Sequence, residues 1–412
     1  MKIKKHLPIF IYTLFAFIAQ ITLIKEILFQ FQGNELIIGI TLGTWLFWTA
    51  IGSIFHTKKI KIPFNIVVII FSISVLFSIF IARSYTSFML RYNYAFMHQL
   101  IDIFIAAQII LALPCLINGF LFTAGCKYIQ NISTVYFIEA LSACVGGIIS
   151  AGFLVYISNV SYLIFTMIIL ASLGILYSTT QRKSVLIILT IFALPLLFPN
   201  VFISKFDKYL LSKKWPYANL VHSQNSKFGN ISVTQYNNQT NIHFNGAIIS
   251  SLPDVFSGEY NAHTPLALHK NPETILLIGG GISNITSEIL KYKSIKKIVY
   301  VEPDYTLIKI AQKYFKDQID LTNPKFEIIN QDPFKYLKNT STIFDVIISN
   351  ISNPDTLELN RFYTKEFFIN AKNHLKEDGI FSISLSGYEN YISKSHKMLL
   401  SITAKTINSV FQ

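Results

Sequence analysis

The sequence predicts two unlike halves: a multi-span α-helical membrane domain, then an α/β domain of the Rossmann-like kind. Three observations favour this fold class. Long apolar stretches fill residues 1–203, charged residues concentrate after them, and residues 271–412 alternate short apolar strands with amphipathic helices. A linker with a small antiparallel β unit is expected between them, over 204–270.

The composition supports a membrane half. Of the 412 residues, 52% are hydrophobic, which is too apolar for one soluble globule. Residues 1–203 contain four of the 22 acidic residues and twelve of the 35 basic ones. The net charge of +13 does not indicate nucleic-acid binding, because no basic run with interleaved aromatic residues occurs. The three cysteines lack metal-ligand spacing, so we expect no metal site.

Apolar stretches near the ~20 residues that a bilayer-spanning helix requires occur seven times. They cover residues 8–25, 36–55, 64–82, 101–125, 134–157, 160–178 and 184–203. Lys and Arg residues in alternate short loops indicate a cytoplasmic N-terminus. Pro195 and Pro199 interrupt the last stretch, so we expect six or seven spans in the inner membrane. Six spans would leave the second half in the cytoplasm, where adenosyl sulfonium compounds are found.

The β unit and the alternating elements follow in order. Alternating residues around "NNQ" and the Asn245-Gly246 pair predict an antiparallel hairpin. Strands are then expected at 274–278, 297–302, 325–329, 344–349 and 380–385, and helices at 284–293, 304–317, 332–338, 363–375 and 391–409. This alternation predicts a parallel sheet covered on both faces, with ligands beyond the carboxyl ends of its strands.

The stretch "ILLIGGGISNITSEIL" indicates a nucleoside site. Gly279, Gly280 and Gly281 allow a tight turn and close approach of a ligand to the backbone. Glu302 ends the second strand, where a carboxylate can accept both hydroxyls of a ribose. Asp332 follows the third strand and can meet the base edge, or cap the next helix, or do both.

The continuation of the loop favours one class of ligand. A dinucleotide places its pyrophosphate on the helix and needs a third small residue for close packing. Asn284 stands at that position. We therefore favour S-adenosylmethionine or its decarboxylated form as a co-substrate over NAD, with no permanently bound cofactor.

Three segments resemble the polyamine aminopropyltransferases, or spermidine synthases, and their membrane-fused bacterial branch. They are "NPETILLIGGGISNITSEILKYKSIKKIVYVEPD", "NQDPFKYL" and "FDVIISNISNPDTLELNRFYTKEFF". The resemblance implies a class I methyltransferase-type fold, with Glu302 on the ribose, Asp332 on the adenine and the three glycines at the cofactor's tail. It also implies attack of an amine on the carbon beside the sulfonium, with release of methylthioadenosine. Because family members continue with further strands, we expect the sheet to be C-terminally truncated.

The acceptor side departs from the soluble members of that family. Asn350 and Asn353 replace both acids of a D-x-x-D-P pattern, and an amide cannot accept a proton from an ammonium. Ile282 replaces an aspartate, and of a Tyr-His-Glu group only Glu259 survives. The co-substrate contacts match, whereas most diamine contacts do not.

Other side chains are candidates for an altered acceptor side. Arg361 can clamp a carboxylate or phosphate, with Tyr363 as a hydrogen-bond partner, or it can be a surface residue at a capped helix start. His263 can be a base or, more plainly, a structural histidine. Asp345 is expected to stabilise a strand–loop junction.

The function predicted from sequence is therefore aminopropyl-type transfer to an amine or other acceptor. The alternatives are a degenerate, non-catalytic nucleoside-binding membrane protein and an S-adenosylmethionine-dependent methyltransferase. The expected partners are the lipid bilayer and a small-molecule acceptor. Self-association is left open.

Overall fold

The computed structural model describes residues 2–55, 64–92, 100–154, 201–385 and 392–411, with isolated positions between 164 and 198. It divides into two compact units, Met1–Ser232 and Val233–Gln412. The division falls within strand β2 (Asn230–Tyr236). The three regions expected from the sequence stay a prediction.

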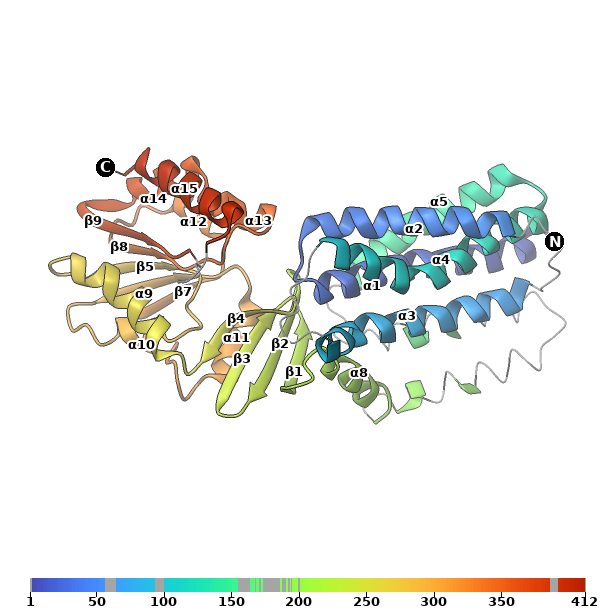
Figure 1. Cartoon of the computed structure of the whole chain (residues 1–412), viewed down its shortest axis with the longest axis horizontal. Helices are drawn as coiled ribbons and strands as arrows, with labels where there is room; N and C mark the ends of the chain where they lie inside the picture. The colour runs from blue at the N-terminus through green and yellow to red at the C-terminus, as the bar shows by residue number, and fades with distance from the viewer. Residues whose placement is uncertain are drawn as a thin grey trace. The chain divides into compact units, whose positions relative to one another are not determined.

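The first unit is built on a bundle of long helices (Figure 1). They are α1 (Lys2–Gln30), α2 (Glu35–Phe55), α3 (Phe64–Tyr92), α4 (Leu100–Ile129) and α5 (Ile132–Ile149), followed by a π turn, η1 (Ser150–Leu154). Among the described residues, five helices are long and apolar enough to cross a bilayer. They coincide with the first five predicted spans. The spans expected at 160–178 and 184–203 lie largely outside the described residues.

Small residues allow the helices of this bundle to approach closely. A side chain at Gly52 of α2 would overlap the backbone of Leu116 in α4, and one at Gly119 would overlap the backbone of Thr49. A Cβ at Gly146 of α5 would lie 2.8 Å from the ring of Phe17 in α1. Such contacts are typical of helices that associate in a bilayer, where packing replaces the hydrophobic effect.

Helix α8 (Ile203–Ser212) is anchored to the bundle by a buried arginine. Arg83 of α3 places Nε and Nη2 each 2.7 Å from the Glu26 carboxylate of α1, and Nη1 2.8 Å from Asp207 of α8. All three side chains are buried. Two hydrogen bonds to backbone carbonyls extend the anchor, from Ser87 to Lys213 and from Lys214 to Phe29.

A small sheet follows α8 along the chain. Its order is β1 (Asn219–Asn225), β2, β3 (Gln239–Phe244) and β4 (Ala247–Leu252). Strands β3 and β4 are antiparallel and are joined by Asn245 and Gly246, which adopt φ angles of 46° and 81°. Positive φ at both positions matches the twist of a two-residue hairpin. The predicted hairpin unit is confirmed, and it extends to four strands.

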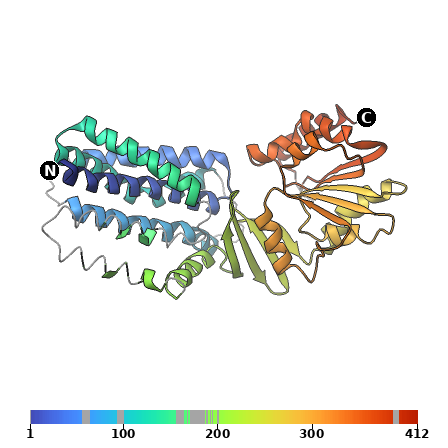
Figure 2. The same ribbon diagram turned by 180° about the vertical axis from the view of Figure 1, so that it is seen from behind.

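The second unit contains a five-stranded parallel sheet, so the predicted Rossmann-like fold is confirmed. Its order is β7 (Phe326–Ile329), β6 (Lys297–Val301), β5 (Thr274–Ile278), β8 (Phe344–Ser349) and β9 (Leu375–Ile383). Helices cover both faces (Figure 2). They are α9 (Val255–Leu268), α10 (Ile285–Ile289), α11 (Tyr305–Tyr314), α12 (Pro333–Asn339), α13 (Leu357–Asn360), the 3-10 turn η2 (Arg361–Tyr363), α14 (Lys365–Asn373) and α15 (Lys394–Asn408).

The two largest differences from the predicted element boundaries concern β9 and α10. Strand β9 begins at Leu375 instead of 380, because Leu375 pairs with Phe344 before residues 376–379 bulge out of the ladder. That polar segment looks like a turn in the sequence and conceals the start of the strand. Helix α10 was predicted over 284–293 but covers only Ile285–Ile289, with turns after it.

Candidate nucleoside site at the carboxyl edge of the sheet

The parallel sheet places four predicted site residues or groups at one edge. The glycines follow β5, Glu302 follows β6, Asp332 follows β7, and Asn350 follows β8. Strand order reverses between β5 and β8, and the crevice outside the carboxyl ends at such a point is where α/β sheets bind ligands. The structure thus brings together the residues that the sequence assigned to an adenosyl ligand.

The glycine loop is closely packed against its own neighbours. Gly279 and Gly280 adopt φ angles of +68° and +69°, which only glycine adopts readily. The side chain of Asn350 lies against Gly280, where an added Cβ would overlap its amide. An added Cβ at Gly281 would overlap the ring of Tyr300 in β6. The loop therefore requires glycine for two reasons, backbone conformation and lack of space.

Glu302 is held by two donors. The Tyr300 hydroxyl donates to Oε2 at 3.1 Å, and the backbone N–H of Asp304 donates to Oε1 at 3.0 Å. Burial raises the pKa of Glu302 to about 7, although both hydrogen bonds act in the opposite direction. Each oxygen keeps a further lone pair, so the fixed carboxylate can accept the two hydroxyls of a ribose.

Tyr300 is a site-positioning residue that the sequence prediction missed. It is fully buried, and it contacts both the glycine loop and Glu302. Successive strand residues point to opposite faces, so residues 300 and 302 project the same way. A tyrosine two positions before the terminal glutamate was therefore a usable signal.

Asp332 has two partners in the structure. Its Oδ1 accepts the backbone N–H of Lys335 at 3.0 Å and so caps α12, as the capping alternative predicted. Its Oδ2 forms an ion pair with Nη2 of Arg361, 29 residues further along the chain. Arg361 thus lies at the predicted base position.

The loop after β8 carries the remaining acceptor-side candidates. Asn350 and Asn353 are half-buried, and the first carboxylate after β8 is the exposed Asp355. The Tyr363 hydroxyl lies 3.0 Å from the carbonyl oxygens of both Ile351 and Ser352. Burial, together with the Asp355 carboxylate, raises the pKa of Tyr363 to about 12. Tyr363 therefore positions this loop rather than pairing with Arg361.

The upstream candidates lie on α9 and beside it. Glu259 is exposed on this helix. A side chain at Gly258 would lie 2.6 Å from Cβ of Asn284, so the family's histidine has no space there. Asn284 in turn accepts the backbone N–H of Asp254 at 2.7 Å, and Ile282 is buried.

Two other candidates have structural partners. His263 lies 3.1 Å from the Glu288 carboxylate and 2.9 Å from the Tyr292 hydroxyl. Asp345 accepts the backbone N–H groups of Glu273 and Thr274 at 3.1 and 2.8 Å, as expected for a strand–loop junction. No group of three or more His, Cys, Asp or Glu in the described part of the chain could hold a metal ion.

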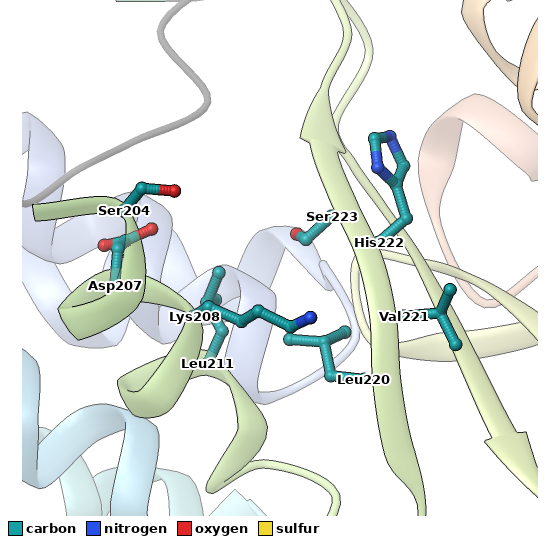
Figure 3. A pocket seen from close by; sticks show the side chains of 8 residues that line it. All are labelled: Ser204, Asp207, Lys208, Leu211, Leu220, Val221, His222 and Ser223. Carbon is teal, nitrogen blue, oxygen red and sulfur yellow. The ribbon is translucent and has the colours of Figure 1, made fainter. Parts of the chain in front are cut away.

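A cavity of about 200 Å³ lies in the first unit (Figure 3). It is lined by Ser204, Asp207, Lys208, Leu211, Leu220, Val221, His222 and Ser223. None of the candidate residues from the sequence lines it, and Asp207 is already paired with Arg83.

Comparisons with known proteins agree with the geometry of the second unit. Residues 256–409 match the family model "Spermine/spermidine synthase domain". The polyamine aminopropyltransferase of Oceanobacillus iheyensis is 30% identical over 169 residues, 40% of this chain and 33% of that protein. The enzyme of the same name from Buchnera aphidicola subsp. Acyrthosiphon pisum is 33% identical over 177 residues, 42% of this chain and 58% of that protein.

A solved spermidine synthase, in complex with the transition-state analogue AdoDATO, is also similar. It is 27% identical, with a TM-score of 0.41, over 47% of this chain and 65% of that one. The chain spans between a third and about three fifths of the length of these two curated relatives.

Proposed function

We propose that this chain, whose residues 256–409 match the spermine/spermidine synthase domain, transfers an aminopropyl-type group from decarboxylated S-adenosylmethionine to an amine or related acceptor. The observation that carries the proposal is the fixed Glu302 carboxylate beside a glycine loop at the switch point of the sheet. Glu302 would hold the ribose, Asp332 the adenine, and Gly279 to Gly281 the tail beyond the ribose.

The proposed reaction is a displacement at carbon. The sulfonium makes its attached methylene carbon electrophilic. The acceptor's lone pair forms a bond to this carbon, the carbon–sulfur electron pair leaves with sulfur as methylthioadenosine, and the surplus proton of the acceptor passes to solvent. The chain's contribution is to hold the two reactants in line.

The residues on the acceptor side favour an acceptor whose nucleophilic group is already unprotonated when it binds. Asn350 lies against Gly280, and its amide cannot remove a proton from an ammonium. We therefore do not assign putrescine as the acceptor. The amides of Asn350 and Asn353 also favour a second candidate function, that of a protein that binds the nucleoside without transferring a group.

A location in the inner membrane, with the second unit in the cytoplasm, is part of the proposal. Five helices that are long and apolar enough to cross a bilayer support the membrane location. A co-substrate found in the cytosol supports the cytoplasmic orientation of the second unit.

Product analysis of the purified full chain in detergent tests the proposal. The protein is incubated with decarboxylated S-adenosylmethionine, or with S-adenosylmethionine, and a panel of amines. We expect methylthioadenosine from the decarboxylated compound, and a loss of that product in Glu302→Gln. S-adenosylhomocysteine would instead identify a methyltransferase. Nucleoside binding without any product would establish the non-catalytic alternative.

A further inference from the structure

We infer that Arg361 belongs to the base-binding half of the site, where it and Asp332 together recognise the edge of adenine. The inference rests on the proposed function, because it assumes an adenosyl ligand. It replaces the sequence-based hypothesis that Arg361 clamps the acceptor.

The guanidinium of Arg361 is fixed on two sides. Its Nε donates to the carbonyl of Glu358 at 3.1 Å, and its Nη2 pairs with Oδ2 of Asp332. Its Cζ lies 4.6 Å from the centroid of the Phe362 ring. Among the described residues, no hydrogen bond is formed by Nη1. One donor is therefore presented next to the Asp332 carboxylate, in a side chain that is 39% exposed.

The residues after Asp332 limit the number of backbone donors at this place. Pro333 has no backbone N–H, so it cannot donate to a ring nitrogen of a base. The N–H of Lys335 is already used by Oδ1 of Asp332. Phe334 then has the one backbone N–H left among the first three residues of α12, and Arg361 adds a side-chain donor beside the Asp332 carboxylate.

The edge of adenine fits an acceptor beside a donor. Its 6-amino group donates, and the neighbouring ring nitrogen accepts. Asp332 can accept from the amino group while Nη1 of Arg361 donates to the ring nitrogen, much as one Asn or Gln amide does. A 6-oxo purine presents an oxygen where the carboxylate lies, so it is repelled. The Asp332–Arg361 pair is formally neutral, which suits an uncharged base.

A two-point clamp on the acceptor would require Arg361 to leave this pair, because Nε and Nη2 are already engaged. The carboxylate of Asp332 would then lose its charged partner while the base is bound. Recognition of the base uses the arrangement already present, so it is the interpretation that the geometry favours.

The test is calorimetry of the full chain in detergent with methylthioadenosine and methylthioinosine. Four proteins are compared: wild type, Arg361→Met, Arg361→Lys and Lys335→Gln. Lys335 is an exposed cation three residues from Asp332 and serves as the matched control. We expect Arg361→Met to bind methylthioadenosine about ten- to a hundredfold more weakly and to lose discrimination against the 6-oxo nucleoside.

Arg361→Lys keeps the charge but not the paired donors, so it should retain part of the affinity and little of the discrimination. Lys335→Gln should bind within twofold of wild type. Thermal unfolding of each variant identifies any that do not fold, and Arg361→Lys alone then decides the question.

The outcomes separate this inference from the proposed function. If wild type binds neither nucleoside, the proposed function fails and the inference fails with it. If wild type binds and both Arg361 variants keep affinity and discrimination, only the inference fails. Tighter binding of methylthioadenosine by Arg361→Met would also overturn the inference, since Arg361 would then block the base position. If the Arg361 variants raised the KM for the acceptor and left the nucleoside affinity unchanged, the hypothesis that Arg361 clamps the acceptor would be supported instead.

Discussion

Tyr300 links the core of the sheet to the nucleoside site. Its ring leaves no space for a side chain at Gly281, and its hydroxyl donates a hydrogen bond to the Glu302 carboxylate. The side chain is fully buried, so its position is set by packing rather than by a ligand. The Glu302 carboxylate is therefore held in place by the protein itself, which reduces the ordering that the proposed contact with a ribose requires.

The raised pKa of Glu302 predicts a pH-dependent affinity for methylthioadenosine. Ribose hydroxyls donate to the ionised carboxylate, and this form predominates above the pKa of about 7. Affinity should be maximal near pH 8 and fall about tenfold per pH unit well below 7. Tyr300→Phe removes a hydrogen bond that lowers this pKa, so the midpoint should move to higher pH. Calorimetry between pH 5.5 and 8.5 measures both profiles, and a flat wild-type profile would contradict the assignment of Glu302.

Asn350→Asp should restore proton removal on the acceptor side. The two side chains have the same shape, so the acid fits against Gly280 where the amide lies now. A positioned general base contributes about 10²- to 10⁴-fold, and we expect methylthioadenosine release with a diamine to rise by at least the lower figure. Asn373→Asp, the same substitution at an exposed position of α14, is the control and should leave the rate unchanged. A variant no faster than wild type would separate this loop from the chemistry.

The sequence predicted single residues well where a local rule applied. The glycines lie in a turn, Asp332 caps a helix, and Glu302 directly follows a strand, each of which depends on neighbours within a few positions. The ion pair between Asp332 and Arg361 joins residues 29 positions apart, and no local pattern identifies it. The packing of Asn350 on Gly280 likewise depends on two strands that are adjacent only in the folded sheet.

At the scale of elements, α8 is joined to the bundle by charge rather than by apolar contact alone. Arg83 holds two carboxylates from two other helices, Glu26 and Asp207, and all three groups are buried. Removing Asp207 would leave the Nη1 donor of Arg83 buried without its acceptor, which costs more than an exposed ion pair contributes. Helix α8 and the bundle should therefore behave as one cooperative element.

Asp207→Ala tests this anchor. The substitution leaves Nη1 of Arg83 without its carboxylate, and we expect a loss of about 1–3 kcal/mol in the stability of the first unit. Thermal unfolding in detergent measures the loss, and proteolysis within residues 213–218 should become faster. Ser204→Ala, at an exposed position one turn before Asp207, is the control. Equal behaviour of the two variants would show that α8 is held by other contacts.

Elements were predictable from sequence where hydrophobic pattern and length agreed. Strands β5 and β8 match their predicted ranges, because each is a short apolar run between turn residues. Strand β9 was shortened in the prediction because Lys376, Glu377 and Asp378 interrupt its pattern within a bulge. A bulge is defined by pairing with a neighbouring strand, and the sequence of one strand does not contain that information.

At the scale of the whole molecule, the proposed orientation in a membrane depends on the number of crossings. With a cytoplasmic N-terminus, an even number of spans before residue 203 leaves the second unit in the cytoplasm. Five candidate spans lie in the described helices, so residues 155–200 would need to contribute one further crossing.

Reporter fusions after Trp215 test the orientation. A fluorescent protein that folds in the cytoplasm should be active at this position, and a phosphatase that is active only in the periplasm should not be. The same phosphatase fused after Gln32, in the turn between α1 and α2, should be active and serves as the positive control. The opposite pattern at Trp215 would place the nucleoside site on the side that lacks its proposed co-substrate.

The loop at residues 350–356 is attached differently from the adenosyl half of the site. The adenosyl half is built into the central strands through Tyr300, whereas this loop is tied down by the hydroxyl of Tyr363 at its Ile351 and Ser352 carbonyls. Apart from Asn350 and Ile351, which lie against Gly280 and Gly279, the side chains of the loop can therefore be exchanged while the packing beneath the proposed donor site stays intact. The architecture thus allows the acceptor to change through exchanges in this loop alone, while the proposed donor site keeps its packing.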